Sequence, residues 1–170
     1  MKTIAIMLLS LALGQTPGIV GTVETTFDKQ ANFAAFHTYT WIAGYNAERD
    51  DAHKAIIAAC EAEMTKLGFK KAAAGTPADV SLAYYTVKAT YVDAKALDTP
   101  QPNGGNGGLP NAALGRLVVI MRRGASRTEQ LWSASTREFV DPDPTKVTPT
   151  IQAATAKIFA TYPGATPKKP

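Results

Sequence analysis

The sequence predicts an α+β domain in which two helices pack on one face of an antiparallel sheet of about five strands. Three observations support this prediction. Segments rich in β-branched residues recur along the chain, and turn residues join several of them in hairpins. Two other segments place apolar residues at helical spacing. Because a sheet with one apolar face needs a cover, the order β-β-α-β-β-β-α gives a two-layer sandwich.

Two strands are expected before the first helix. Residues 22–28 and 38–42 are rich in β-branched and aromatic side chains, which fit a pleated, half-buried surface. Residues 32–36 between them are predicted to form a compact turn. Because side chains alternate along a strand, one face of the first strand is expected to carry Val23, Thr25 and Phe27.

The first helix is predicted over residues 51–67. Asp50 and Asp51 suit its first turn, where a carboxylate accepts hydrogen bonds from free amides and complements the positive end of the helix dipole. Gly68 suits the left-handed residue that ends many helices. Apolar residues at helical spacing give this helix one face for the core: Ile56, Ile57, Cys60, Met64 and Leu67.

Three strands joined by hairpins are expected next, over residues 80–92, 115–122 and 129–140. The glycine- and proline-rich residues 99–110 have no periodic pattern, so we place them at the tip of a long hairpin as a mobile surface connection. Residues 124–128 are predicted to form the second, tighter turn.

The first of these three strands has apolar residues on both faces at its start. Val80, Leu82 and Tyr84 share one face, which turns polar further along. The opposite face stays apolar through Tyr85 and Val87. We therefore expect both faces to be buried early in the strand and only one face to be buried later.

The second helix is expected to begin at Thr148 as the N-cap, with Pro149 at the first helical position. Residues 141–144, in which aspartates and prolines alternate, end the preceding strand because proline cannot donate to a ladder. Residues 163–164 end the helix, and residues 164–170 are predicted to be a disordered tail. The apolar stripe of the helix consists of Ile151, Ala154, Ile158, Phe159 and Tyr162.

Composition limits the classes of protein to consider. The 170 residues contain 18 Lys and Arg against 14 Asp and Glu, for a net charge of +4. Basic residues occur singly or in pairs, whereas a nucleic-acid surface needs them clustered, so we expect no nucleic-acid partner. Cys60 is the one cysteine, so an intramolecular disulfide is excluded. Its place on the apolar stripe predicts a small buried hydrophobe.

Residues 1–14 have the pattern of a secretory signal peptide: Lys2, an apolar run, and small residues before a cut after Gly14. The apolar run is roughly ten residues, whereas a transmembrane helix needs about 20, so no transmembrane span is expected once the signal is removed. We expect a periplasmic or secreted protein. The predicted division is a signal peptide over 1–14, a spacer over 15–21, one domain over 22–163 and a tail over 164–170.

No arrangement of residues predicts catalysis, a cofactor or a metal. Residues 99–110 lack the Gly-Lys-Ser/Thr sequence and the following helix that bind phosphate. His37 and His53 belong to no metal-binding motif, and zinc sites need three or four converging ligands. The sequence around Ser126 departs from the Gly-x-Ser-x-Gly elbow and lies between two strands. We therefore assign no catalytic, cofactor-binding or metal-binding residue.

The aromatic residues leave an alternative open. Core packing is the first interpretation, because aromatic rings dominate the cores of small domains. The alternative is an aromatic-lined groove, which would serve a small ligand-binding protein or a hydrolase. The set comprises Phe33, Phe36, Tyr39, Trp41, Tyr85, Tyr91, Trp132 and Phe159.

Six short segments between residues 22 and 163 occur in an order and spacing that are distinctive as a set. They are Phe27-Asp28, residues 32–41, residues 63–69, Ala78-Asp79-Val80, Leu131-Trp132 and residues 158–163. Together they resemble the bacterial envelope family catalogued as domain of unknown function 4136, many members of which are lipoproteins. The resemblance implies an α+β envelope domain, and it implies no catalytic residues.

The sequence also departs from that family. No cysteine follows the apolar run of residues 1–14, so we do not expect a lipid anchor. Ser133 stands where the family usually has arginine, and the strand from Gly115 lacks the usual acidic residue at its end. We expect an exported, envelope-associated domain with a non-enzymatic binding or structural role. Its expected partner is an envelope protein or envelope component, and a further hypothesis makes residues 103–108 a docking arm.

Overall fold

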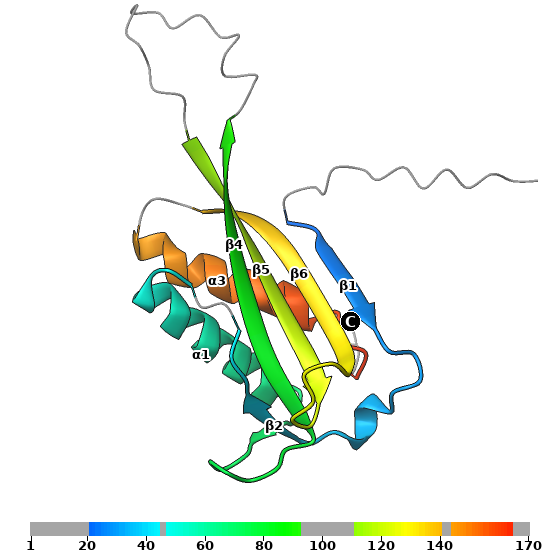
Figure 1. Cartoon of the computed structure of the whole chain (residues 1–170). Coiled ribbons are helices and arrows are strands. Elements are labelled where there is room, and N and C mark those ends of the chain that lie inside the picture. The colour runs from blue at the N-terminus through cyan, green and yellow to red at the C-terminus, as the bar shows by residue number, and fades with distance from the viewer. Residues whose placement is uncertain (1–20, 45–46, 93–110, 141–143, 165–170) are drawn as a thin grey trace, which may run out of the picture.

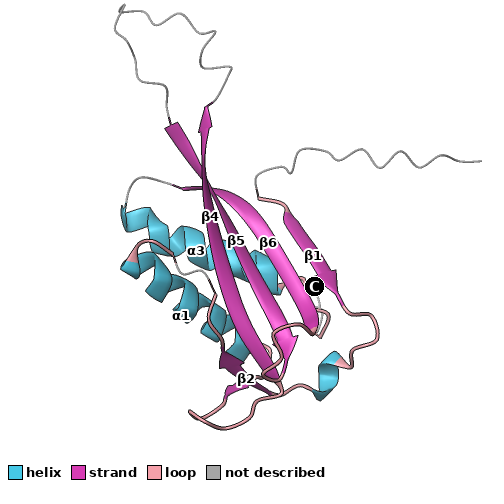
Figure 2. Cartoon of the chain, in the orientation of Figure 1, coloured by secondary structure: helices cyan, strands magenta, loops and turns pink. Residues whose placement is uncertain are grey.

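The computed structural model describes residues 21–44, 47–92, 111–140 and 144–164. These residues form two layers, a twisted sheet and a pair of helices that cover one of its faces (Figure 1; Figure 2). The mixed α+β class predicted from the sequence is confirmed. The elements are β1 (Val23–Phe27), a 3-10 turn η1 (Phe33–Ala35), β2 (Thr38–Trp41), α1 (Asp50–Lys66), β3 (Lys70–Lys71), β4 (Val80–Val92), β5 (Asn111–Arg123), β6 (Gln130–Val140) and α3 (Pro144–Phe159).

The sheet has six strands in the order β1-β6-β5-β4-β2-β3, and it is mixed. Neighbours among β1, β6, β5 and β4 pair antiparallel, whereas β2 runs parallel to both β4 and β3. The prediction of an antiparallel sheet of about five strands is therefore wrong in direction and in number. The chain passes from β2 to β4 through α1, and parallel neighbours need such a crossover. Strand β3 is a pair of lysines, which has no alternating pattern to indicate a strand.

The long hairpin of β4 and β5 is paired from Val80 with Arg123 to Val92 with Asn111. Strand β5 therefore begins at Asn111, earlier than the expected start at residue 115. Residues 93–110 include the expected glycine-rich tip and lie outside the described residues. The tighter turn between β5 and β6 contains Gly124 at a φ of 50°, in the left-handed region.

Helix α1 runs over Asp50–Lys66, within one residue of the prediction at each end. Its N-cap is Arg49, which makes no capping side-chain hydrogen bond, and Asp51 accepts hydrogen bonds from Arg49 and from the Ala52 amide. Gly68 has a φ of 86°, so the expected left-handed terminator is confirmed.

Helix α3 begins at Pro144, not at Thr148 as expected, and Pro149 lies inside it. Proline suits the first helical position because the amide of that residue has no partner within the helix. Pro144 takes that position here. Pro149 then costs the helix one interior hydrogen bond, and the apolar stripe of α3 continues past it.

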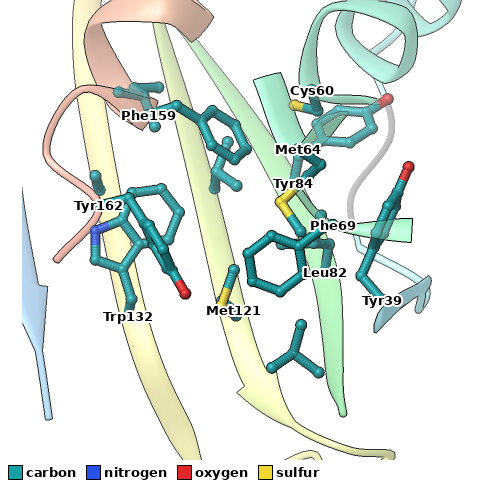
Figure 3. Close-up of a cluster of buried hydrophobic side chains, with 14 of the residues drawn as sticks. Tyr39, Cys60, Met64, Phe69, Leu82, Tyr84, Met121, Trp132, Phe159 and Tyr162 are labelled. Carbon is teal, nitrogen blue, oxygen red and sulfur yellow. The ribbon is translucent and has the colours of Figure 1, made fainter. Parts of the chain in front are cut away.

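The core lies between the helices and the sheet (Figure 3). Both predicted helical stripes contribute to it, because residues of α1 and α3 pack against side chains from the central strands. Its largest fully buried side chains are Trp132, Phe159, Met64, Leu82, Met121, Leu131 and Ile158. No helix among the described residues is long and apolar enough to cross a membrane.

The two faces of β4 differ along the strand. Val80, Leu82 and Tyr84 are buried beneath the helices. On the opposite face Ser81 and Ala83 are also fully buried, so early burial of both faces is confirmed. Further along, however, the apolar second face is not covered: Val87 is 56% exposed. At Tyr85 and Val87 the apolar pattern of this face therefore marks a partly exposed surface and not the predicted core, and the side chains of residues 88–92 lie outside the described residues.

Candidate functional site

The two histidines make structural contacts in different parts of the molecule. The His37 backbone amide donates a hydrogen bond to Asp79 Oδ2 at 2.9 Å. His53 Nδ1 lies 2.5 Å from the Tyr84 hydroxyl oxygen, which also accepts a hydrogen bond from the Ala47 amide. In the described part of the chain, no group of three or more His, Cys, Asp or Glu residues could hold a metal ion.

Cys60 is fully buried on the core side of α1, which confirms its predicted role as a small hydrophobe. Burial, together with the nearby carboxylates of Glu61 and Glu63, raises the pKa of its thiol to about 12. At neutral pH the thiol is therefore protonated, whereas a reactive cysteine needs its thiolate form.

The rings that define the alternative groove lie mostly in the core. Tyr39, Trp132 and Phe159 are at most 3% exposed. The Trp132 ring packs against Phe159 and Tyr162, with centroid distances of 5.5 and 5.8 Å (Figure 3). These rings hold the helices to the sheet and do not line a surface groove.

The remaining aromatic residues of the set have different environments. Phe33, Phe36 and Trp41 are partly buried and pack against the same core. Tyr85 lies on the face of the sheet away from the helices, at the position opposite Val118 of β5. The side chain of Tyr91 lies outside the described residues.

Asp79 forms a hydrogen-bonded clamp between the starts of β2 and β4, and its sequence context does not predict this role. Its Oδ2 accepts hydrogen bonds from the amides of His37 and Thr38 and from the Thr38 hydroxyl, at 2.8 to 2.9 Å. The Asp79 amide in turn donates to the Thr38 hydroxyl oxygen at 3.0 Å. These hydrogen bonds lower the pKa of the Asp79 carboxyl. The Ala-Asp-Val sequence at the start of β4 therefore aligns β2 with β4.

Glu61 of α1 connects the helix to the last residues of β2 and β3. Its Oε1 accepts hydrogen bonds from Trp41 Nε1 at 3.0 Å and from Lys71 Nζ at 2.5 Å. Burial acts to raise the pKa of Glu61, but the hydrogen bonds from Lys71 and Trp41 outweigh it and leave the pKa lowered. The ionised carboxylate thus connects β2, β3 and the helix.

One face of the sheet remains without a helix, and we call it the open face. Figure 1 shows α1 and α3 together on the other side of the strands. Because side chains alternate, the open-face residues are those that lie between the core residues of each strand. They are Glu24 and Thr26 of β1, Ser133, Ser135 and Arg137 of β6, Arg116, Val118, Ile120 and Arg122 of β5, and Ser81, Ala83, Tyr85 and Val87 of β4.

The centre of the open face is apolar. Tyr85 of β4 lies opposite Val118 of β5, and Ile120 lies next to Val118 on the same face. These three side chains are half-buried, and Val87 beside them is largely exposed. Together they form an apolar strip across the two longest strands.

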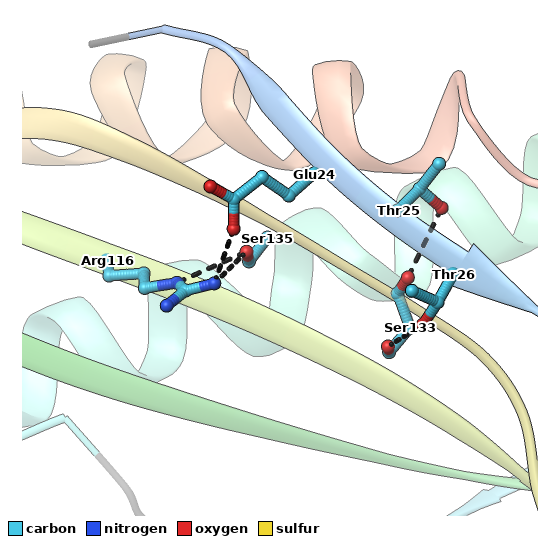
Figure 4. A network of polar contacts seen from close by, with 6 residues as sticks. All are labelled: Glu24, Thr25, Thr26, Arg116, Ser133 and Ser135. Atoms are coloured by element: carbon cyan, nitrogen blue, oxygen red, sulfur yellow. Dashed lines mark hydrogen bonds and ion pairs between the residues drawn. The ribbon is translucent and has the colours of Figure 1, made fainter. Parts of the chain in front are cut away.

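Polar side chains occupy the side of the open face nearest β1 (Figure 4). Arg116 Nη2 lies 2.8 Å from Glu24 Oε2 and donates to Ser135 Oγ at 2.9 Å. The Thr26 and Ser133 hydroxyls lie 2.9 Å apart. This network connects three strands, β1, β6 and β5, on the face away from the helices.

Arginine side chains flank the apolar strip. Arg116 and Arg137 lie directly opposite each other on β5 and β6, an arrangement of like charges that destabilises a sheet. Glu24 forms an ion pair with Arg116. Within the described residues no ion pair is formed by Arg137 or by Arg122, which lies opposite Ser81. The described open face therefore has more positive than negative charge.

The fold and this surface define a class of protein: a two-layer α+β domain with helices on one face of its sheet and a partly exposed opposite face. Residues 23–164 match the family described as domain of unknown function (DUF4136), and the chain belongs to that family. The resemblance predicted from the sequence is thereby confirmed. Among curated proteins, none matches this chain.

Solved structures with low sequence identity share the fold. A DUF4136 family protein from Bacteroides thetaiotaomicron is 20% identical, with a TM-score of 0.53 over 84% of this chain and 96% of its own. A PelC dodecamer from Paraburkholderia phytofirmans is 14% identical, with a TM-score of 0.51 over 82% of this chain and 94% of its own.

A PDZ domain protein from Parabacteroides distasonis is also similar, at 14% identity and a TM-score of 0.58. The match covers 85% of this chain and 36% of that protein, so this chain corresponds to about a third of the larger one. At these identities the likeness concerns the fold.

Proposed function

We propose that the protein is an exported domain of the cell envelope that binds a partner protein on its open face and catalyses no reaction. The observation that supports this most is the placement of Arg116 opposite Arg137 beside an uncovered apolar strip. Opposed like charges cost a sheet stability, and the Glu24 ion pair offsets the charge of Arg116 alone. A partner that supplies negative charge would offset the charge of Arg137.

The side chains of the open face indicate what kind of surface the partner needs. Burial of the exposed parts of Tyr85, Val87, Val118 and Ile120 requires apolar side chains on the opposing surface. Arg137 and Arg122 call for carboxylates at the margins of that surface, because a guanidinium pairs with a carboxylate in a fixed, two-pronged geometry. We therefore describe the partner as an envelope protein with an apolar patch bordered by Asp or Glu.

Export is supported by residues 1–14, whose pattern is that of a signal peptide. The proposed mature chain begins at Gln15, and it has no cysteine at its start to accept a lipid. Intact-mass measurement of the native protein, combined with cell fractionation, tests this part of the proposal. A periplasmic protein of the mass of residues 15–170 is expected, and a cytoplasmic protein that retains residues 1–14 would contradict export.

Site-specific photo-crosslinking in living cells tests the binding proposal. A photo-reactive phenylalanine analogue replaces Val87 on the open face or Gln152 on the exposed side of α3. We expect one discrete crosslinked protein from position 87 and not from position 152. Identical products from both positions, or none from position 87, would contradict the assignment of the open face.

A further inference from the structure

The two edges of the sheet are built differently. One edge is β3, whose two residues are both lysines, and lysine at an edge discourages the addition of another strand. The other edge is β1, with the sequence Val-Glu-Thr-Thr-Phe. It has neither lysine nor proline and is rich in residues that favour strands. Only the β1 edge is therefore suited to continue the sheet.

Alternate residues of β1 direct their backbone amides and carbonyls away from β6, to the outside of the sheet. The Asp28 amide donates to the Leu131 carbonyl at 2.8 Å, which continues the register of β1 with β6. Because hydrogen-bonded pairs alternate in an antiparallel ladder, Glu24 and Thr26 direct their backbone groups to β6. The amides and carbonyls of the alternate residues, Val23, Thr25 and Phe27, point away from the sheet.

The same edge exposes an apolar side chain. Phe27 is 44% exposed and is one of two large hydrophobic residues in the described chain with high exposure. Its ring packs in a T-shaped arrangement with the Phe33 ring, with centroids 6.3 Å apart. Phe27 belongs to β1, which is the end strand of the sheet (Figure 1).

We propose that β1 pairs antiparallel with β1 of a second copy of this chain, about a two-fold axis at Thr25. In this register the outward groups of Val23, Thr25 and Phe27 meet the same set in the opposite order, which forms about six backbone hydrogen bonds. Val23 of each copy lies opposite Phe27 of the other and covers it. The six-stranded sheets of the two copies become one.

The side chains of β1 favour β1 of a second copy as the strand that pairs with this edge. Glu24 is the one charged residue of the strand, and this register places it opposite Thr26 and not opposite another Glu24. Like charges are therefore not opposed across the new pair. The Glu24 carboxylate also keeps its ion pair with Arg116 of its own copy, because that contact lies on the open face.

The two-fold axis is perpendicular to the sheet, so it places both open faces on the same side of the joined sheet. The pairing uses β1 alone and holds whether or not a partner binds the open face. A variant of the open face such as Arg137→Glu is therefore expected to leave the pairing unchanged, which separates the two proposals.

Sedimentation velocity over a concentration series of the mature chain tests the pairing. We expect a monomer–dimer equilibrium that Thr25→Pro shifts to monomer, because proline removes an outward amide. The substitution leaves the backbone hydrogen bonds with β6 in place, but it also removes the Thr25 hydroxyl, which donates to the Ser133 carbonyl at 3.2 Å. Thr25→Val removes the same hydroxyl but keeps the amide, so it should still dimerise. A chain that stays monomeric at every concentration, or a dimer that Thr25→Pro does not weaken, would overturn the proposal.

Oxidative crosslinking gives a second readout that does not depend on the proline variant folding. Thr25 faces Thr25 of the second copy, with Cα atoms about 5.5 Å apart in a hydrogen-bonded pair, within reach of a disulfide. Thr25→Cys should form a covalent dimer under mild oxidation, whereas Gln152→Cys on the surface of α3 should not. Equal crosslinking of the two variants would contradict a specific β1 pair.

Discussion

Asp79 shows how one side chain can set the position of two strands. Its carboxylate accepts three hydrogen bonds from His37 and Thr38, so it fixes the start of β2 beside the start of β4. The sequence indicates an acidic residue before a strand but not its partners, which lie 41 and 42 positions away. By contrast, Gly68 and Cys60 were predictable, because helix termination and helical spacing are local properties of the chain.

Replacement of Asp79 with alanine is expected to lower the free energy of unfolding by about 1–2 kcal/mol at neutral pH, because charge-assisted hydrogen bonds at an exposed site are lost. The hydrogen bonds lower the pKa of this carboxyl in the folded state. Its contribution is therefore complete above the unfolded pKa of about 3.9 and disappears as the pH falls through the lower folded value. Chemical denaturation of both proteins from pH 7 to pH 2 measures this. A difference that persists unchanged at the lowest pH would contradict the clamp.

Thr155 of α3 is fully buried, and its hydroxyl has no hydrogen-bond partner within the described structure. An unpaired buried hydroxyl carries a desolvation cost, and valine has nearly the same shape without it. Thr155→Val is expected to raise the free energy of unfolding by about 1 kcal/mol. Thermal unfolding measures the change, with the exposed Thr148→Val as the control. A destabilised Thr155→Val protein would show that the hydroxyl is paired.

At the scale of elements, the strongly periodic helices and strands were predicted well, whereas the relative directions of the strands were not. The apolar stripes of α1 and α3 and the strand β4 follow from spacing alone. The parallel direction of β2 and the strand β3 depend on the crossover through α1 and on backbone pairing, which leave no pattern in Lys70-Lys71. The start of α3 was misplaced because two prolines, at 144 and 149, each fit a first helical position.

The docking of α3 rests on Ile158, which is fully buried in the core. Ile158→Ala is expected to cost about 2–5 kcal/mol, because buried methyl groups are removed and a cavity is left. The exposed Gln152→Ala on the same helix serves as the control and should change stability by less than about 0.5 kcal/mol. Equal effects of the two substitutions, measured by chemical denaturation, would mean that α3 does not pack on the sheet as described.

At the scale of the whole molecule, the proposed function depends on which face of the sheet the two helices cover. Alternation predicts that β4 has two apolar faces, but it does not say which face the two helices cover. The helices cover the Val80, Leu82 and Tyr84 face, and Val87 on the other face is exposed. The candidate surface was therefore not predictable from the sequence, because it arises from strands that come together only in the folded sheet.

The open face contains a residue for which stability and binding are expected to change in opposite directions. Arg137 lies opposite Arg116, so Arg137→Glu replaces two facing positive charges with a facing pair of opposite charge. The substitution is expected to raise the free energy of unfolding by about 0.2–1 kcal/mol. It also reverses the charge that the proposed partner recognises.

The most direct test of the account is the yield of the position-87 photo-crosslink in cells that express Arg137→Glu. The exposed Arg127→Glu in the turn between β5 and β6 makes the same charge change away from the open face and serves as the control. We predict that Arg137→Glu loses the crosslinked partner while unfolding at the same or a higher temperature than the unaltered protein, and that Arg127→Glu retains it. An undiminished crosslink in Arg137→Glu would contradict the claim that the open face is the binding surface.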